Sequence, residues 1–416
     1  MHYISYGKKQ VSVNLSGKNL LGIIKPLGPS KIADTKTDFT DLENIIQGRK
    51  KALIVVPDIT RKAHLNEILE AVLPMFEKTG CEVEILIATG LHKAQDKEQI
   101  NEMFGQEIAE RYRIISHTQD KKTHKNLGVT SLGVPIVLNK LLLNHDFIMT
   151  IGVIEPHLYA GFSGGPKTIA IGCAGEPTIN ATHSLKFLGD ENTKLCETES
   201  NPFHQTLWEI IKPIKIDYSI NLVNDAQGNL LKCFSGQLEK VYKDGIKFVK
   251  ENFILSVDGV ADAAICGLGF PKDSNLYQAS RVINYLLDVE NPIIKTGGCL
   301  IIAAELSEGA GNGIGEIRFY KDLRSIKDPA EFLSHIKKVG FKAGGHRTYM
   351  VLKHLRKYDI VFVSGNQKLF ENTPFKCFSD INDAINYASK KNKAKTKFYI
   401  YPKTLNSIAK ATNPGA

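Results

Sequence analysis

The stretch from Glu155 to Ser184, EPHLYAGFSGGPKTIAIGCAGEPTINATHS, contains three side chains whose types could do chemistry. His157 can donate or accept a proton, Lys167 can act as an amine nucleophile, and His183 carries an imidazole of the kind that binds metals. They surround a glycine-rich turn, and a tight turn that runs into a helix could bring all three into one pocket. Because packing alone rarely needs that combination, the stretch favours an enzyme.

Further polar side chains follow two expected strands upstream. Asp58, Thr60 and Arg61 come at the end of one apolar run, and His92 follows the next. In a parallel α/β sheet, ligands bind beyond the carboxyl ends of the strands. We therefore expect Asp58, Arg61 and His92 to lie at the same edge as His157. Taken alone, Thr60 is better explained as a loop residue that caps a helix.

The glycine-rich segment GFSGGPK could hold a phosphate, because glycines let backbone N–H groups approach an anion closely. It lacks the GxxxxGK[ST] spacing of a Walker A loop, and Pro166 removes one donor. Three roles remain open for Lys167: a phosphate contact, an amine bonded covalently to a cofactor, or a solvated lysine of the turn. Cationic neighbours in a dry pocket would lower the pKa of the amine and favour the covalent role.

We expect His183 to lie early in a helix that starts after Pro177. A single histidine on a helix is more often structural than a metal ligand, and no HxxxH or HxxE pattern accompanies it. If His183 binds a metal, most of the other ligands must come from elsewhere, such as an organic cofactor.

Short apolar runs alternate with longer amphipathic segments along the chain, which predicts a parallel α/β sheet. The predicted strands are 52–58, 82–90, 145–156, 261–267, 299–306, 359–365 and 397–402, and the predicted helices are 63–80, 96–110, 237–253, 275–289 and a pair within 315–340. Residues 215–235 read as two extended runs joined by a turn at 226–229. We expect two α/β domains with mostly parallel sheets and an active-site cleft between them. The first domain, 1–256, would carry the cofactor and the catalytic histidines, and the second, 257–416, would close over the substrate.

Composition narrows the class of protein. The net charge of +9 is spread thinly, and the short lysine-rich stretches are not interleaved with aromatic residues, so no nucleic-acid partner is expected. The seven cysteines never form a CxxC pair, which argues against a disulfide framework and against zinc or iron–sulfur sites. The N-terminus has no apolar signal core and no run is long enough to span a membrane. These features predict a soluble cytoplasmic protein.

The motifs together resemble those of the nickel-dependent lactate racemases and their 2-hydroxyacid racemase and epimerase relatives. The resemblance rests on PHLYAGFSGGPK followed by His183, on PDITR and ATGLHK upstream, and on PKDSNLYQASR downstream, and it covers essentially the whole chain. It implies an isomerase that inverts C2 of a small-molecule 2-hydroxyacid. It also implies a nickel-pincer nucleotide, a pyridinium-3-thioamide-5-thiocarboxylate mononucleotide that holds Ni through two sulfurs and a ring carbon.

Carried over residue by residue, the resemblance gives each group a role. Lys167 is the thioamide-forming lysine, His183 the nickel ligand, and His92 and His157 the two acid/base groups. One histidine would take the hydroxyl proton while the α-hydrogen leaves as hydride, and the other would do so for the opposite enantiomer. The implied cofactor contacts are Lys167, Asp58, Ile59, Thr60, Arg61, Ser163, Gly164, Gly165, Gln278 and Arg281, and the implied substrate contacts are Arg61, Tyr277, Gln278 and Arg281. Cofactor-synthesis and nickel-insertion proteins are the implied partners, and a homo-oligomer is compatible with the family.

Two departures from the family concern the substrate. The family's Gln-x-x-Lys stands here as Gln278-Ala-Ser-Arg281, and Lys62 follows Arg61 where many relatives have proline. A guanidinium presents a wider planar fork than an ammonium. We therefore predict a 2-hydroxyacid larger or more polar than lactate, such as a malate-like acid or a sugar acid.

Two other functions stay open. A Schiff-base lysine enzyme would use Lys167 with a phosphate cofactor on the glycine turn, but it leaves the three histidines without a task. A non-catalytic relative would bind the nucleotide without turnover.

Overall fold

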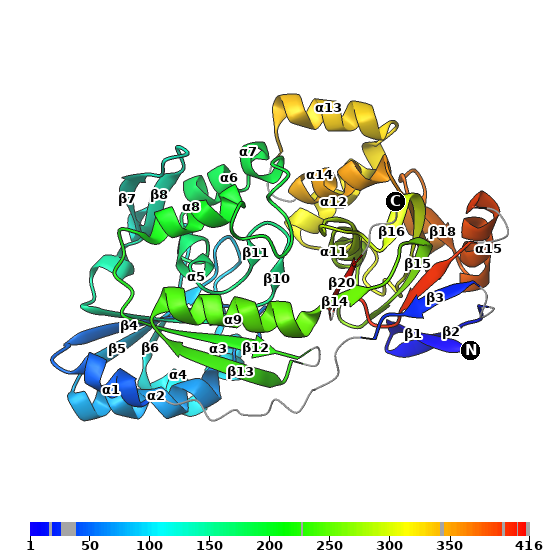
Figure 1. Cartoon of the computed structure of the whole chain (residues 1–416). Helices are drawn as coiled ribbons and strands as arrows, with labels where there is room; N and C mark the ends of the chain where they lie inside the picture. The colour runs from blue at the N-terminus through cyan, green and yellow to red at the C-terminus, as the bar shows by residue number, and fades with distance from the viewer. Residues whose placement is uncertain are drawn as a thin grey trace. The chain divides into compact units, whose positions relative to one another are not determined.

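The computed structural model describes residues 1–15, 19–25, 39–225, 228–341, 345–392, 396–405 and 407–412. The chain forms two compact units, each an α/β arrangement with a mostly parallel sheet, as the alternation of patterns predicts (Figure 1). Unit 1 consists of Met1–Gly28, Ser184–Leu188 and Asn252–Ala416, and unit 2 of Pro29–His183 and Gly189–Glu251. No helix in these described ranges is both long and apolar enough to cross a membrane.

Unit 2 is built on a six-stranded sheet with the order β13-β12-β9-β4-β5-β6. Neighbouring strands run parallel, except that β12 and β13 form an antiparallel hairpin. The strands are β4 (Lys51–Pro57), β5 (Glu82–Ala88), β6 (Arg113–Ser116), β9 (Phe147–Val153), β12 (Tyr218–Asn224) and β13 (Leu230–Gly236). The central strands β4 and β9 are buried along nearly their whole length, which explains why they read as continuous apolar runs.

Helices cover both faces of this sheet (Figure 1). They are α1 (Thr40–Ile46), α2 (Leu65–Thr79), α3 (Lys97–Phe104), α4 (Gln106–Arg111), α5 (Lys167–Ala170), α6 (Glu176–Thr182), α8 (Pro202–Ile211) and α9 (Leu238–Phe253). The helix predicted at 63–80 is α2, and Gly80 ends it with a φ of 69°. The remaining elements are the hairpin of β7 (His124–Val129) and β8 (Pro135–Asn139), the short pair β10 (Pro156–His157) and β11 (Gly161–Phe162), and the 3₁₀ turns Lys121–Thr123 and Lys140–Leu143.

The topology of this sheet marks a place for a ligand. β4 has β5 on one side and β9 on the other, so the chain leaves β4 in one direction and later returns to its opposite edge. Such a switch point opens a crevice at the carboxyl ends of the strands. The segments that follow these three strands begin at Asp58, Thr89 and Ile154.

Unit 1 contains an eight-stranded sheet in which β18-β17-β16-β15-β1-β2 are in order, with β19 also paired to β15 and β3 paired to β19. Its strands are β1 (His2–Gly7), β2 (Lys9–Val13), β3 (Leu20–Ile23), β15 (Ala261–Gly269), β16 (Ile294–Ala303), β17 (Asp359–Val363), β18 (Lys376–Phe378) and β19 (Phe398–Tyr401), with β14 (Ile254–Val257) and β20 (Ile408–Ala411) as a separate pair. Its helices are α7 (Leu185–Leu188), α10 (Leu276–Ala279), α11 (Arg281–Leu287), α12 (Ile314–Ser325), α13 (Pro329–Val339), α14 (Gly345–Leu355) and α15 (Ile381–Asn392), with a 3₁₀ turn at Gln367–Phe370.

The N-terminal segment lies in a different unit from the one that the sequence suggests. Residues 1–28 read as part of the N-terminal domain, yet β1 runs parallel to β15 and β3 runs parallel to β19. Ile4 and Val13 are fully buried in the core of unit 1. Strand pairing between segments more than two hundred residues apart leaves no trace in a local pattern, so this pairing could not be predicted from the sequence.

The predicted helix around His183 is wrong in its placement: α6 runs from Glu176 to Thr182 and His183 caps its C-terminal end, because Pro177 is tolerated in the first turn, where backbone N–H groups have no helical partner. The hairpin at 215–235 is confirmed as β12–β13, although residues 226 and 227 of its turn lie outside the described residues. The helix at 96–110 is two helices separated at Gly105.

Candidate active site

The first pair of the site joins the loops after β4 and β5. His92 Nδ1 lies 2.6 Å from Asp58 Oδ2, and Asp58 is buried while the His92 side chain is exposed. The Thr60 hydroxyl donates to Asp58 Oδ1 at 2.5 Å. Burial opposes ionisation of Asp58, but the hydrogen bonds from His92 and Thr60 and the charge of His92 outweigh it, so the pKa of Asp58 is lowered. The ionised carboxylate fixes the proton of His92 on Nδ1 and leaves Nε2 as the basic nitrogen.

The second pair joins the loops after β4 and β9. Arg61 Nη1 donates to a carboxylate oxygen of Glu155. A guanidinium carries five N–H donors, so this contact leaves others for an anionic ligand.

Lys167 opens α5 directly after the glycine turn and is half-buried. Burial and the positive charge of Arg61 lower the pKa of its amine to about 8, against the opposing influence of Asp58. At neutral pH a useful fraction of the amine is therefore unprotonated and nucleophilic. This environment is the one in which the covalent role proposed for Lys167 is most favoured.

The glycine turn is anchored to the sheet by Asn221 of β12. The Gly165 N–H donates to Asn221 Oδ1 at 2.9 Å, and both Gly164 and Gly165 have positive φ, 72° and 50°. A Cβ on Gly165 would lie 2.5 Å from ring atoms of Tyr242, so only glycine fits there. The Ser163 hydroxyl donates to the Val153 carbonyl at 2.7 Å. These groups hold the turn in place, and their predicted cofactor contacts stay predictions.

His157 has the opposite proton arrangement to His92. Its Nδ1 accepts hydrogen bonds from the backbone N–H groups of Tyr159 and Ala160, each at 3.2 Å. In the neutral ring the proton is consequently on Nε2, which can donate it. The ring also packs edge-on against Tyr159, with centroids 5.6 Å apart.

His183 ends α6 with its ring held by the helix. Its Nδ1 lies 3.0 Å from the Ile179 carbonyl, which can only accept, so Nδ1 carries the proton and Nε2 keeps the lone pair. Burial and the charge of Lys167 lower the pKa of His183 to about 4. The neutral imidazole is the form that ligates a metal. In the described part of the chain, no group of three or more His, Cys, Asp or Glu side chains is placed to hold a metal ion.

These contacts bring the predicted site residues of unit 2 into one neighbourhood. The charge of Lys167 lowers the pKa of His183. The charge of Arg61 lowers the pKa of Lys167, and the charge of Asp58 raises it. The ring of Tyr159 contacts two histidine rings: its centroid lies 5.6 Å from that of His157 and 5.9 Å from that of His183. The half-buried Ile59 lies next to Asp58 in the same loop.

Three predicted site residues belong to unit 1. Tyr277, Gln278 and Arg281 are half-buried on α10 and at the start of α11. The Asn275 side chain caps α10 by accepting from the Gln278 N–H at 3.0 Å. The Arg347 guanidinium stacks over the Tyr277 ring at 5.0 Å.

Sequence reasoning missed three residues of this neighbourhood. Glu155 pairs with Arg61, Tyr159 connects two histidine rings, and Asn221 holds the glycine turn. Glu155 and Tyr159 stand inside the EPHLYAG motif, so its spacing could have signalled them. Asn221 lies in a distant strand with no motif of its own, so only the fold reveals it.

Comparison with known proteins identifies the family. The lactate racemase N-terminal domain family matches residues 6–195, and the lactate racemase C-terminal domain family matches residues 259–409. A lactate racemase of Lactiplantibacillus plantarum is 30% identical over 308 residues, which are 73% of this chain and 70% of the relative. The chain belongs to the lactate racemase family.

Other members support the same assignment. A lactate racemase of Thermoanaerobacterium thermosaccharolyticum is 28% identical over 348 residues, 80% of each chain. The solved structure of the lactate racemase apoprotein from that organism has a TM-score of 0.87 at 25% sequence identity, covering 98% of this chain and 99% of its own. As a member of this family, the protein is an isomerase of the racemase type.

Proposed function

We propose that this racemase inverts C2 of a 2-hydroxyacid, with His92 and His157 as the proton-transfer groups and with a nickel-pincer nucleotide attached to Lys167. The observation that carries the proposal is the opposite proton arrangement of the two histidines around one reactive amine. The relatives named above are lactate racemases, which makes lactate the first substrate to test.

The residues present suit that cofactor. Lys167 offers a half-buried amine with a pKa of about 8, which suits formation of an amide-type bond. His183 offers Nε2 of a neutral ring, with Nδ1 fixed by the Ile179 carbonyl in the way that outer hydrogen bonds commonly orient metal ligands. When bound, the nucleotide supplies nickel and a hydride acceptor for the α-hydrogen.

The chain's own groups handle the protons. His92, oriented by the Asp58 carboxylate, is arranged to accept the hydroxyl proton of one enantiomer at Nε2. His157, whose Nδ1 accepts two backbone N–H groups, would hold its proton at Nε2 in a hydrogen bond to the oxygen on C2. For the opposite enantiomer the two roles exchange. Arg61, held by Glu155, has N–H donors left for the substrate carboxylate.

Substrate size is the part of the proposal that rests on unit 1. Tyr277, Gln278 and Arg281 are proposed to contact the substrate, with Arg281 suited to a second carboxylate or to extra hydroxyls. Replacing Arg281 with lysine should then lower kcat/KM for malate more than for lactate. A wild-type preference for lactate over every larger acid would show that Arg281 only replaces the family's lysine.

The biological setting follows from the cofactor. We infer a cytoplasmic protein that depends on cofactor-synthesis and nickel-insertion proteins for its activity. We also propose that the chain forms a homo-oligomer, which a molar mass measured by light scattering tests.

The deciding experiment combines mass, metal and turnover. The protein is produced in a host that makes the pincer nucleotide, and intact mass, bound nickel and racemisation of each lactate enantiomer are measured. We expect a mass adduct that Lys167→Ala removes, nickel content that His183→Ala lowers, and turnover that His92→Ala or His157→Ala abolishes. Full nickel occupancy in His183→Ala contradicts the metal assignment, and an adduct without turnover on any 2-hydroxyacid favours the non-catalytic alternative.

A further inference from the structure

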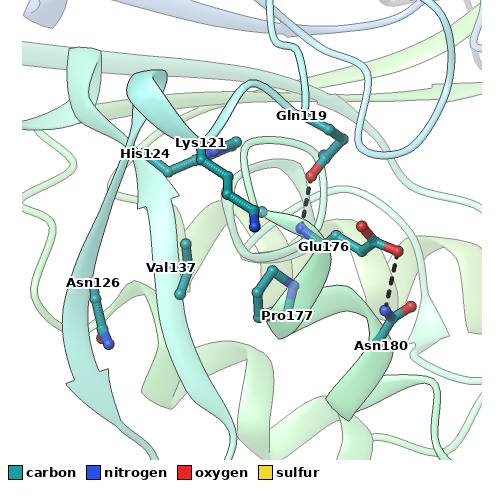
Figure 2. Close-up of a pocket in the computed structure, with 9 residues that line it drawn as sticks. Gln119, Lys121, His124, Asn126, Val137, Glu176, Pro177 and Asn180 are labelled. Atoms are coloured by element: carbon teal, nitrogen blue, oxygen red, sulfur yellow. Dashed lines mark hydrogen bonds between the residues drawn. The ribbon is translucent and has the colours of Figure 1, made fainter.

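A pocket in unit 2 shares no residue with the candidate active site. It has a volume of about 480 Å³ and lies between the β7–β8 hairpin and the start of α6 (Figure 2). The lining residues that matter here are Lys121, His124, Val137, Gly175, Glu176 and Pro177. A volume of this size suits a small organic molecule.

The floor of the pocket is partly apolar. Val137 of β8 and Pro177 of α6 supply the apolar surface. The Gly175 N–H donates to the Val137 carbonyl at 2.8 Å, and the Val137 N–H donates to the Thr178 hydroxyl at 2.9 Å, so strand and helix are tied together beneath the pocket. A Cβ on Gly175 would lie 2.9 Å from Val137 Cγ1 and 3.5 Å from His124 Cδ2, so glycine keeps this wall open.

Opposite charges stand on the two sides of that floor. Lys121 extends into the pocket from the β7 side, and Glu176 lies on the α6 side, where its carboxylate accepts from the Asn180 amide at 3.3 Å (Figure 2). Among the described residues, neither Lys121 nor Glu176 makes an ion pair. Two opposite charges that face one pocket without joining each other can be bridged by a ligand that carries both signs.

His124 supplies a further polar group to the same wall. Its Nε2 is buried and has no hydrogen-bond partner in the portion of the chain that the structure describes. Burial lowers the pKa of this ring, so the ring is uncharged at neutral pH. Its Nε2 can then donate or accept a hydrogen bond, depending on the tautomer. A buried polar atom without a partner commonly marks a place for water or a ligand.

We propose that this pocket binds a small zwitterion, an α-amino acid with an apolar side chain. The carboxylate meets Lys121, the ammonium meets Glu176, and the side chain covers Val137 and Pro177. The proposal concerns binding alone and holds or fails independently of the racemase mechanism.

Titration calorimetry of the full chain with L-leucine tests the proposal. Two matched compounds separate the charges: 4-methylpentanoate lacks the ammonium, and 3-methylbutylamine lacks the carboxylate. We expect saturable binding of one leucine, with each matched compound about tenfold weaker, since each lacks one charge-assisted contact. Absence of saturable leucine binding, or equal binding of 4-methylpentanoate and leucine, overturns the proposal.

Variants locate the binding. Lys121→Ala should weaken leucine about tenfold and leave 3-methylbutylamine unchanged, and Glu176→Gln should weaken leucine and leave 4-methylpentanoate unchanged. Both side chains are exposed, so both variants should fold. Lys125→Ala, a neighbouring exposed lysine outside the pocket, is the matched control and should bind leucine as the wild type does. Equal weakening by Lys125→Ala, or loss of leucine binding in Arg61→Ala, would place the binding elsewhere and sink the assignment.

Discussion

The buried Asp58 carboxylate sets the proton arrangement of the His92 ring. An imidazole can carry its proton on either nitrogen, and the Asp58 carboxylate selects Nδ1 in His92. The backbone N–H groups of Tyr159 and Ala160 select Nε2 in His157. The two histidines have the same side chain, but in the folded protein they carry the proton on different ring nitrogens.

This difference predicts the effect of Asp58→Asn. The amide can still contact His92, but it no longer stabilises the imidazolium that forms when His92 accepts a proton. We expect kcat/KM of the loaded enzyme to fall at least about 100-fold for both enantiomers, because His92 acts as base in one direction and as acid in the other and the equilibrium constant of racemisation is one. Steady-state rates for both enantiomers provide the measurement, with the exposed Asp244→Asn as control. Unchanged rates in Asp58→Asn would remove the Asp58–His92 pair from the mechanism.

The amine of Lys167 gives a prediction that needs no cofactor. Because its pKa is lowered to about 8, acetylation of Lys167 in the apoprotein should increase with pH around that value. The positive charge of Arg61 is one cause, so Arg61→Ala should move the midpoint to higher pH. Competitive acetylation followed by mass spectrometry measures it, with the exposed Lys125 as the internal reference. A Lys167 profile that coincides with that of Lys125 would contradict the lowered pKa.

At the scale of elements, the turn between β11 and α5 depends on two features of one glycine. Gly165 has a positive φ and faces the ring of Tyr242, while Gly48 has a positive φ of 75° with nothing within 4 Å of an added Cβ. Both alanine variants carry the backbone strain, but only Gly165→Ala adds overpacking. We expect Gly165→Ala to lower the free energy of unfolding by about 1–3 kcal/mol more than Gly48→Ala. Denaturant titrations of the two variants provide the comparison, and equal losses would mean that Tyr242 moves aside freely.

A buried charge cluster joins two helices of unit 1. Asp288, at the end of α11, bonds to His354 Nε2 at 2.9 Å and to Lys353 Nζ at 2.8 Å, both on α14. Burial opposes ionisation of Asp288, but the nearby charges of His354 and Lys353 outweigh it and hold the pKa of Asp288 well below its ordinary value of 3.8.

The direction of that shift gives a pH dependence. A carboxylate whose folded pKa is lowered stabilises the protein fully above its unfolded pKa and loses that contribution as pH falls toward the folded pKa. Asp288→Asn should therefore cost about 3 kcal/mol near neutral pH, and the cost should shrink below about pH 4. Unfolding free energies across pH 3 to 7 test it, with the exposed Asp328→Asn as a surface comparison. If the loss of unfolding free energy in Asp288→Asn does not change with pH, the variant destabilises the protein through altered packing and not through the lost charge.

At the scale of the whole molecule, the chain crosses between two cores more than once. Ile4 is fully buried in the core of unit 1, and Ile54 is fully buried in the core of unit 2. Each change to alanine should cost about 2–5 kcal/mol. Ile4→Ala should speed hydrogen exchange in β15 and β19 and leave β4 and β9 unchanged, and Ile54→Ala should do the reverse. Faster exchange in both sheets from either variant would mean that the two units unfold as one.

The sequence by itself determined the α/β class, most strands and helices, and the groups that we propose for the chemistry. These features depend on local periodicity and on motifs such as PHLYAGFSGGPK, which a linear chain displays directly. The tertiary structure alone decided that β1 joins β15, that Asn221 holds Gly165, that Glu155 meets Arg61, and on which nitrogen each histidine carries its proton. Each of those outcomes is a contact between separate segments or a hydrogen bond set by local backbone geometry. Neither leaves a pattern along the chain, because both form only when folding brings the partners to within a few ångströms.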